Sequence, residues 1–171
     1  EDDKSDLQTC LTTYDTASSN KKYSMKFREA TPADIPGMHV VRLAVKENVL
    51  SHEGRVTEAD YVEMLEEEHG KGWVCTVDDR IVGFAIVDVM FHNVWALFIQ
   101  PEFENQGIGK QLHKLMLDWT FRQQGLDSLW LSTAVGTRAE EFYRRHGWQK
   151  SGVTESGEAH FEMKKEMWVK N

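Results

Sequence analysis

Hydrophobic and polar residues follow a helical period in two stretches early in the chain. From Thr31 onward, apolar residues recur at steps of three and four, which predicts a first helix. Thr31-Pro-Ala-Asp34 marks its start, because it supplies an N-cap, a proline in the first turn and an acidic residue. Thr57-Glu-Ala-Asp60 has the pattern of a capping box and predicts a second helix that ends near Gly70. The apolar stripe of the first helix consists of Ile35, Met38, Val41 and Val45.

Runs of β-branched and aromatic residues predict strands before, between and after these helices. The predicted strands cover residues 26–30, 72–78, 80–90, 93–100, 128–133, 147–153 and 159–168. Asp78-Asp79 separates two of them and predicts a hairpin. Two further helices follow: one whose apolar residues are Ile108, Leu112, Leu115 and Trp119, and one that is capped by Thr137 and ends at Gly147. This order predicts an α/β fold with a central mixed sheet of about seven strands and helices on both faces.

Residues 1–24 differ in composition from the rest and are interpreted as an N-terminal leader left from a tag or as a native extension. Leu7, Leu11 and Tyr14 have helical spacing, which suggests a short docked helix within this segment. Residues 25–171 are expected to form a single domain, because 171 residues with 40% hydrophobic content are enough for one core.

Composition excludes several classes of function. No run approaches the roughly 20 apolar residues of a membrane-spanning helix. The net charge of −8 argues against binding to nucleic acid or to an anionic membrane surface. Cys10 and Cys75 are too few for a disulfide framework, and neither they nor the histidines have metal-ligand spacing. We therefore expect a cytoplasmic protein without a metal.

The stretch with the clearest chemistry is Gln106-Gly-Ile-Gly-Lys110, which joins a buried strand to the start of an amphipathic helix. A helix N-terminus offers unpaired N–H groups and a partial positive charge, which suit a phosphate. Gly107 and Gly109 lack a Cβ, so that the backbone can approach that phosphate, and Lys110 could add a cation. A Walker loop is excluded because Gln111 follows the lysine, and a dinucleotide fingerprint is excluded because Leu112 replaces its third glycine.

Two segments of the chain carry a recognisable pattern. The first, Ile99-Gln-Pro followed by Glu104-Asn-Gln-Gly-Ile-Gly109, is similar to the acyl-CoA signature of the GNAT-type N-acetyltransferase superfamily, Gln/Arg-x-x-Gly-x-Gly/Ala. Gly136-Thr-Arg-Ala-Glu-Glu-Phe-Tyr-Arg-Arg-His-Gly-Trp148 resembles its second landmark, Asn-x-x-Ala-x-x-x-Tyr-x-x-x-Gly-Phe. The opening FREATPADIPGM looks like the family's first strand and helix, and the matches together cover about residues 25–165.

This resemblance implies a mostly antiparallel sheet that splays near its middle to admit the pantetheine of acetyl-CoA. It also implies direct transfer of the acetyl group to a small amine or to an exposed protein amine, with acetyl-CoA as cosubstrate, and, by analogy, a homodimer. The residues that it implies for acetyl-CoA binding are Leu97, Phe98, Ile99, Asn105, Gln106, Gly107, Ile108, Gly109, Lys110 and Gly136. Tyr143 corresponds to the landmark tyrosine and is expected to be the general acid. We expect its neighbour Phe142 to anchor the helix in the core while the phenol faces the cleft.

The sequence departs from the family pattern at two positions. Glu104 stands where Gln or Arg is usual, and Gly136 stands where Asn is usual. A carboxylate beside a pyrophosphate would be repulsive, so we expect Glu104 to face solvent while backbone amides and Lys110 hold the phosphates. Gly136 lacks the side-chain contact that Asn would make.

The general base is the least determined role. The strand 93–100 contains no carboxylate, and Glu47, Glu53, Asp88 and His92 are all candidates, as is a chain of water molecules. Glu47 is the first choice, because the family's first two helices and their loop border the acceptor cleft. Cys75 is interpreted as a core residue. Two alternative functions stay open: a non-catalytic acyl-CoA-binding module, and transfer of another short acyl group.

Overall fold

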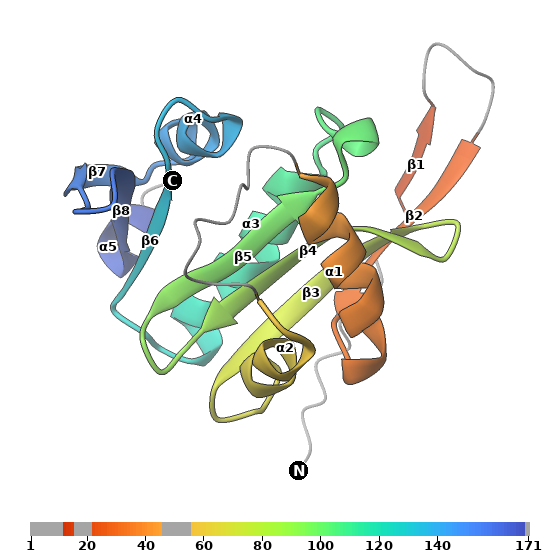
Figure 1. Ribbon diagram of the computed structural model, residues 1–171, viewed down its shortest axis with the longest axis horizontal. Helices are drawn as coiled ribbons and strands as arrows, with labels where there is room; N and C mark the ends of the chain where they lie inside the picture. Colours follow the sequence, from red (N-terminus) through yellow and green to blue (C-terminus); the bar gives the residue numbers. More distant parts are fainter. Residues whose placement is uncertain (1–11, 16–21, 46–55, 170–171) are drawn as a thin grey trace.

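The computed structural model describes residues 12–15, 22–45 and 56–169, and Figure 1 shows their arrangement. These residues form one sheet of eight strands in the order β1-β2-β3-β4-β5-β6-β8-β7. The strands are β1 (Thr12–Asp15), β2 (Lys22–Glu29), β3 (Gly70–Val77), β4 (Arg80–Asp88), β5 (Asn93–Ile99), β6 (Ser128–Ala134), β7 (Gln149–Val153) and β8 (Glu158–Lys164). Every neighbouring pair is antiparallel except β5 and β6, which run parallel. The predicted mixed sheet is thus confirmed.

The first strand is an addition to the seven that the sequence predicts. β1 pairs with β2 from Thr12↔Met25 to Asp15↔Lys22. The predicted short helix is therefore wrong at Tyr14, which lies in this strand. The neighbouring edge of β2 offers backbone hydrogen bonds to an extended segment, and these favour a strand over a helix. Leu7 and Leu11 lie outside the described residues.

Helices cover both faces of the sheet (Figure 1). α1 (Ile35–Ala44) and α2 (Glu58–Met64) pack on one face, and α3 (Ile108–Asp118) packs on the other. Their buried residues, among them Met38, Tyr61, Leu112 and Met116, close two apolar clusters against the central strands. α4 (Arg138–Arg145) and α5 (Lys165–Val169) lie beside β6 and β8. None of the described helices is both long and apolar enough to cross a membrane.

Local sequence signals set most boundaries. The backbone N–H of Thr57 donates to the Asp60 carboxylate at 2.6 Å, and the Asp60 N–H donates to the Thr57 hydroxyl at 3.3 Å, as the capping box predicts. Asp78 and Asp79 both have positive φ, at 48° and 66°, which matches the twist of a two-residue hairpin.

Two predicted boundaries were wrong. Gly70 begins β3 rather than capping α2, which ends at Met64. A Cβ at Gly70 would lie 2.4 Å from the Val87 carbonyl oxygen, so this close approach of backbones requires glycine. The chain after Lys164 turns into α5, where the sequence predicted that the last strand continues.

β5 and β6 meet at only one position, and this shapes the site. Asn93↔Trp130 is their single register pair. The Trp130 backbone N–H donates to the His92 carbonyl at 2.9 Å, and its indole N–H donates to the Phe91 carbonyl at 2.8 Å. Beyond this point the strands separate, so the sheet opens between its two halves (Figure 1).

Candidate active site

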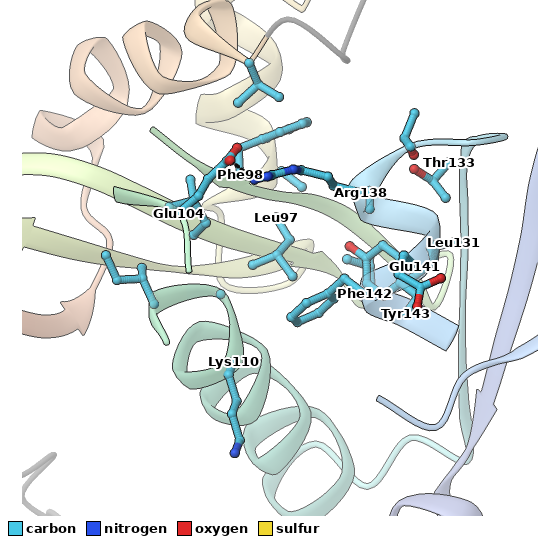
Figure 2. Close-up of a pocket in the computed structure, with 18 of the residues that line it drawn as sticks. Leu97, Phe98, Glu104, Lys110, Leu131, Thr133, Arg138, Glu141, Phe142 and Tyr143 are labelled. Atoms are coloured by element: carbon cyan, nitrogen blue, oxygen red, sulfur yellow. Dashed lines mark hydrogen bonds and ion pairs between the residues drawn. The ribbon is translucent and has the colours of Figure 1, made fainter. Parts of the chain in front are cut away.

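The opening between β5 and β6 holds a cavity of about 530 Å³. Its walls are residues 94–99 of β5 and residues 131–134 of β6. The start of α3 and the first turns of α4 complete it, as Figure 2 shows. A cavity of this size is in the range of sites that bind small molecules and cofactors.

Leu97, Phe98 and Ile99 lie on the β5 wall, as the sequence predicts. They pair with Ala85, Phe84 and Gly83 of β4, which uses one edge of β5. Because Asn93 is the one β5 residue that pairs with β6, the opposite edge of β5 has no strand partner along these three residues within the described part of the chain. That edge presents backbone N–H and C=O groups to the cavity, where an extended ligand can pair with them.

A β-bulge lies at the base of the same wall. Val94 pairs with Val87 and Ala96 pairs with Ile86, so Trp95 is an extra residue on β5. A bulge bends its strand and increases the local twist. It therefore helps to turn β5 away from β6 at the point where the cavity begins.

The loop into α3 brings backbone N–H groups to the cavity. Gly107 is the N-cap of α3, with φ of 80° in the left-handed region, and Asn105 has φ of 62°. No side chain among the described residues caps this helix, so its first N–H groups are available to an anionic ligand. Asn105, Gly107, Ile108 and Gly109 all line the cavity.

Three predicted binding residues are placed differently. Lys110 borders the cavity, but its side chain projects away from it along α3 (Figure 2). Gln106 is not among the residues that line the cavity. Gly136 is not either, and its N–H donates to the Glu140 carboxylate at 2.7 Å. The same contact is the main cause that lowers the pKa of Glu140.

Tyr143 lines the cavity from α4 while its ring lies in the core. It is 6% exposed and packs against Trp148, Phe161 and His113. Burial raises the pKa of its hydroxyl. We find no hydrogen-bond partner for that hydroxyl among the residues that the structure describes. A phenol that stays protonated at neutral pH and faces a cavity can donate to a bound ligand.

Phe142 is more exposed than predicted. The sequence predicts that Phe142 anchors α4, but Tyr143 is the buried member of the pair and Phe142 is half-buried at the cavity. Its ring stacks on His146, with centroids 4.0 Å apart. The reason lies in the position of α4 over β6 and β8, which turns the Tyr143 side of the helix toward Phe161.

Glu104 also departs from expectation. Its side chain lines the cavity instead of facing solvent, and it forms an ion pair with Arg138 of α4. Figure 2 shows this contact as a dashed line across the cavity. Nothing in the sequence pairs these two residues, since they belong to different elements.

Of the candidates for the general base, Glu47 and Glu53 lie outside the described residues. Asp88 accepts hydrogen bonds from the Met90 and Phe91 N–H groups at 2.9 and 3.1 Å, so it orders the β4–β5 turn. Neither Asp88 nor His92 lines the cavity. Neither is therefore positioned to act on a ligand there.

Sequence reasoning missed the polar residues that β6 and β8 contribute. Ser132 and Thr133 of β6 and Glu158 of β8 line the cavity. No motif marks them, because their place follows from sheet order alone. Cys75 is fully buried and burial raises the pKa of its thiol to about 12, which fits the core role that we expected. Within residues 12–15, 22–45 and 56–169 no group of His, Cys, Asp and Glu could hold a metal ion.

Comparison with solved structures identifies the same architecture elsewhere. A PaiA N-acetyltransferase from Thermoplasma acidophilum in complex with coenzyme A is 18% identical with a TM-score of 0.68, over 82% of this chain and 99% of that one. A ribosomal-protein-S18-alanine N-acetyltransferase from Escherichia coli is 18% identical with a TM-score of 0.62, over 81% and 91%. A mutant of spermidine N-acetyltransferase SpeG from Vibrio cholerae is 16% identical with a TM-score of 0.66, over 85% and 96%.

These identities are low, so the three structures establish the fold alone. Among curated protein sequences none matches significantly. The family model of the acetyltransferase (GNAT) family, in contrast, matches residues 39–148, which include both walls of the cavity, the α3 loop and Tyr143. Acetyl-CoA is accordingly the acyl donor. The chain belongs to the GNAT acetyltransferase family.

Proposed function

We propose that the protein transfers the acetyl group of acetyl-CoA directly to a primary amine, with both substrates bound together. The observation that carries this proposal is the open edge of β5 facing β6, in a cavity that the uncapped start of α3 and Tyr143 also line. An extended thioester fits such a site: its pantetheine pairs with the strand edge and its pyrophosphate meets the helix N-terminus.

In this arrangement Leu97, Phe98 and Ile99 supply backbone groups to pantetheine, and an N–H from the same edge polarises the thioester carbonyl. Asn105, Gly107, Ile108 and Gly109 form the phosphate loop, with the backbone of Lys110. Gly109 has room for this role, because a Cβ there would meet Phe142 and Ile99 only at 3.6 to 4.0 Å. The residue thus borders the cavity and is not needed to relieve a clash in the core.

The chemical step needs a proton donor. The amine nitrogen attacks the thioester carbonyl carbon, and the carbon–sulfur bond breaks to release the thiolate of CoA. The Tyr143 hydroxyl hydrogen-bonds this thiolate and delivers a proton to it, after which solvent restores the phenol. A phenol is protonated at neutral pH at its ordinary pKa, and burial raises the pKa of Tyr143 further, so the hydroxyl is available as a donor.

The attacking amine must be neutral, and its nitrogen must lose a proton during the reaction. Glu47 remains our candidate for the base, which Glu47→Gln tests. If it is the base, turnover falls and the pH profile of kcat loses its acidic limb, while the affinity for acetyl-CoA is unchanged. Unchanged turnover would leave deprotonation to solvent.

The acceptor belongs to the amine class, as a small molecule or an exposed protein amine. The test is a panel of amines, including a polyamine, an α-amino acid and a peptide with an N-terminal alanine, scored by thiol release from acetyl-CoA. We expect acetyl-CoA to raise the melting temperature and at least one class of amine to release thiol in proportion to acetylated product. Stabilisation by acetyl-CoA with no turnover on any amine would oppose the proposal.

A further inference from the structure

An ion pair between Glu104 and Arg138 spans the cavity between the two halves of the sheet. Glu104 directly follows the helical turn Pro101–Phe103 that comes after β5. Arg138 is the first residue of α4, which follows β6. Both side chains line the cavity, and Figure 2 shows them meeting across it.

Both partners are partly exposed: 61% of the Arg138 side chain and 32% of the Glu104 side chain are accessible. Ion pairs of this exposure contribute little to stability, so a stronger anion can replace the carboxylate. The phosphate groups of CoA are such anions, because the diphosphate as a whole and the 3′-phosphate each carry about two negative charges where a carboxylate carries one, and phosphate oxygens accept two parallel N–H groups of a guanidinium. Glu104 lies three residues before Gly107, at the start of the proposed phosphate loop.

The other cations that line the described cavity are Lys110 and Arg145. Lys110 projects away along α3 (Figure 2). Arg145 pairs with Glu141 of its own helix at 3.7 Å. Arg138 is thus the cation whose charge is directed across the cavity, and a carboxylate of the same chain meets it there.

We propose that Arg138 binds a phosphate group of acyl-CoA and that this phosphate displaces Glu104 from it. The inference rests on the proposed function, since it concerns the same cavity and the same donor. It gives the acid at the first position of the signature a role: Glu104 occupies the phosphate-binding arginine until CoA arrives, and it weakens CoA binding by competition.

The experiment measures CoA affinity by calorimetry in four proteins: the full chain, Arg138→Gln, Glu104→Gln and the double variant. Arg138→Gln should weaken binding about tenfold, as expected for loss of a charge-assisted contact at a partly exposed site. Glu104→Gln should tighten binding by up to about fivefold, in line with the small free energy of an exposed pair. In the Arg138→Gln background, Glu104→Gln should have little effect, because no arginine is left to release.

Matched controls come from the same cavity. Arg145→Gln and Glu141→Gln change the same charges on a pair that stays within α4. They should alter CoA affinity less than twofold, and thermal unfolding of all variants should show that each is folded. Dephospho-CoA, which lacks the 3′-phosphate, identifies the phosphate that Arg138 binds. If Arg138→Gln weakens the binding of both CoA and dephospho-CoA, Arg138 binds the pyrophosphate. If it weakens the binding of CoA alone, Arg138 binds the 3′-phosphate.

Two results would overturn the inference. If Arg138→Gln lowers the affinity for CoA no more than Arg145→Gln does, Arg138 binds no phosphate. If Glu104→Gln tightens binding equally with and without Arg138, the carboxylate acts by simple repulsion and is not displaced from the arginine. In both cases CoA binding by the unmodified protein would leave the proposed function standing. A protein that does not bind CoA would contradict both proposals.

Discussion

The indole N–H of Trp148 donates to Nε2 of His113 at 2.9 Å, inside the apolar cluster that supports Tyr143. This contact requires that His113 be neutral, because a protonated imidazole has no acceptor nitrogen. Burial, helped by the nearby His146, lowers the pKa of His113 to about 3 from 6.5. Because of this pair, the stability of the core behind the candidate active site depends on pH.

The first prediction follows from this pKa. Between pH 6.5 and 3 the unfolded chain binds a proton at His113 and the folded chain does not, so acid favours unfolding. The contribution of His113 is fully present above pH 6.5 and is lost as the pH falls, at about 1.4 kcal/mol per unit, or about 2 kcal/mol at pH 5. Denaturant unfolding at several pH values measures it.

His113→Gln provides the control for this prediction, since the amide oxygen can still accept from Trp148 without titrating. In this variant the slope of the unfolding free energy against pH should be smaller by the value that corresponds to one proton, about 1.4 kcal/mol per pH unit. Equal slopes in the two proteins would mean that His113 titrates normally in the folded state. Because only the difference is used, the other histidines do not affect the result.

The second prediction concerns Tyr143→Phe. Loss of one hydroxyl removes a proton donor but almost no packing, so turnover should fall about 10²- to 10⁴-fold while CoA affinity and melting temperature hardly change. Steady-state kinetics at saturating acetyl-CoA, with calorimetry for CoA, separate these effects. If the hydroxyl is structural instead, the variant loses stability and keeps its rate.

The third prediction uses a second buried phenol, that of Tyr61, as a contrast. The Tyr61 hydroxyl accepts from Arg42 Nε at 3.0 Å, and the Arg42 guanidinium lies 4.7 Å from the Trp95 ring centre. Arg42 is 5% exposed, and its Nη2 has no partner among the described residues. Tyr61→Phe should therefore lower the unfolding free energy by about 1–3 kcal/mol, because it leaves a second buried donor unsatisfied.

Arg42→Met completes this test. Replacing a buried cation with an apolar side chain is often neutral or stabilising, so the double variant should be more stable than Tyr61→Phe alone. Chemical denaturation of the two single variants and the double variant measures this coupling. Strictly additive losses would show that Tyr61 does not act through Arg42.

The fourth prediction is that Gly109→Val abolishes acetyl-CoA binding without unfolding the protein. The new side chain would extend from a Cβ that has ordinary contacts with Phe142 and Ile99, so it fills the cavity rather than the core. Acetyl-CoA at 100 times its Kd should add about 2.7 kcal/mol to the unmodified protein and nothing to this variant. Gly109→Ala should have an intermediate effect. A full ligand-induced melting shift in Gly109→Val would place the phosphates elsewhere.

The fifth prediction tests the domain boundary. A chain that begins at Met25 loses β1 but keeps every pair between β2 and β3, from Met25↔Val77 to Glu29↔Trp73. We expect it to unfold cooperatively and to bind CoA like the full chain. Loss of cooperative unfolding on this truncation would show that residues 1–24 belong to the domain.

The features that the sequence predicts well depend on residues close together in the chain. The Thr57–Asp60 capping box, the Asp78-Asp79 hairpin and the loop that delivers Gly107 and Gly109 to α3 all form from neighbouring residues. Backbone dihedral preferences and short-range hydrogen bonds determine such features, so composition and spacing are enough.

The geometry of the site depends instead on how distant segments meet. Glu104 and Arg138 are 34 residues apart, and their contact depends on how far β6 diverges from β5. Tyr143 rather than Phe142 is the buried ring because α4 packs with its Tyr143 side against Phe161. Local propensities do not encode these contacts. The contacts depend on the angle between the two halves of the sheet, which the Asn93↔Trp130 pair and the packing on either side of it set. The sequence alone thus determined most of the elements and the glycine-containing loop at the start of α3, while tertiary packing decided which side chains line the cavity.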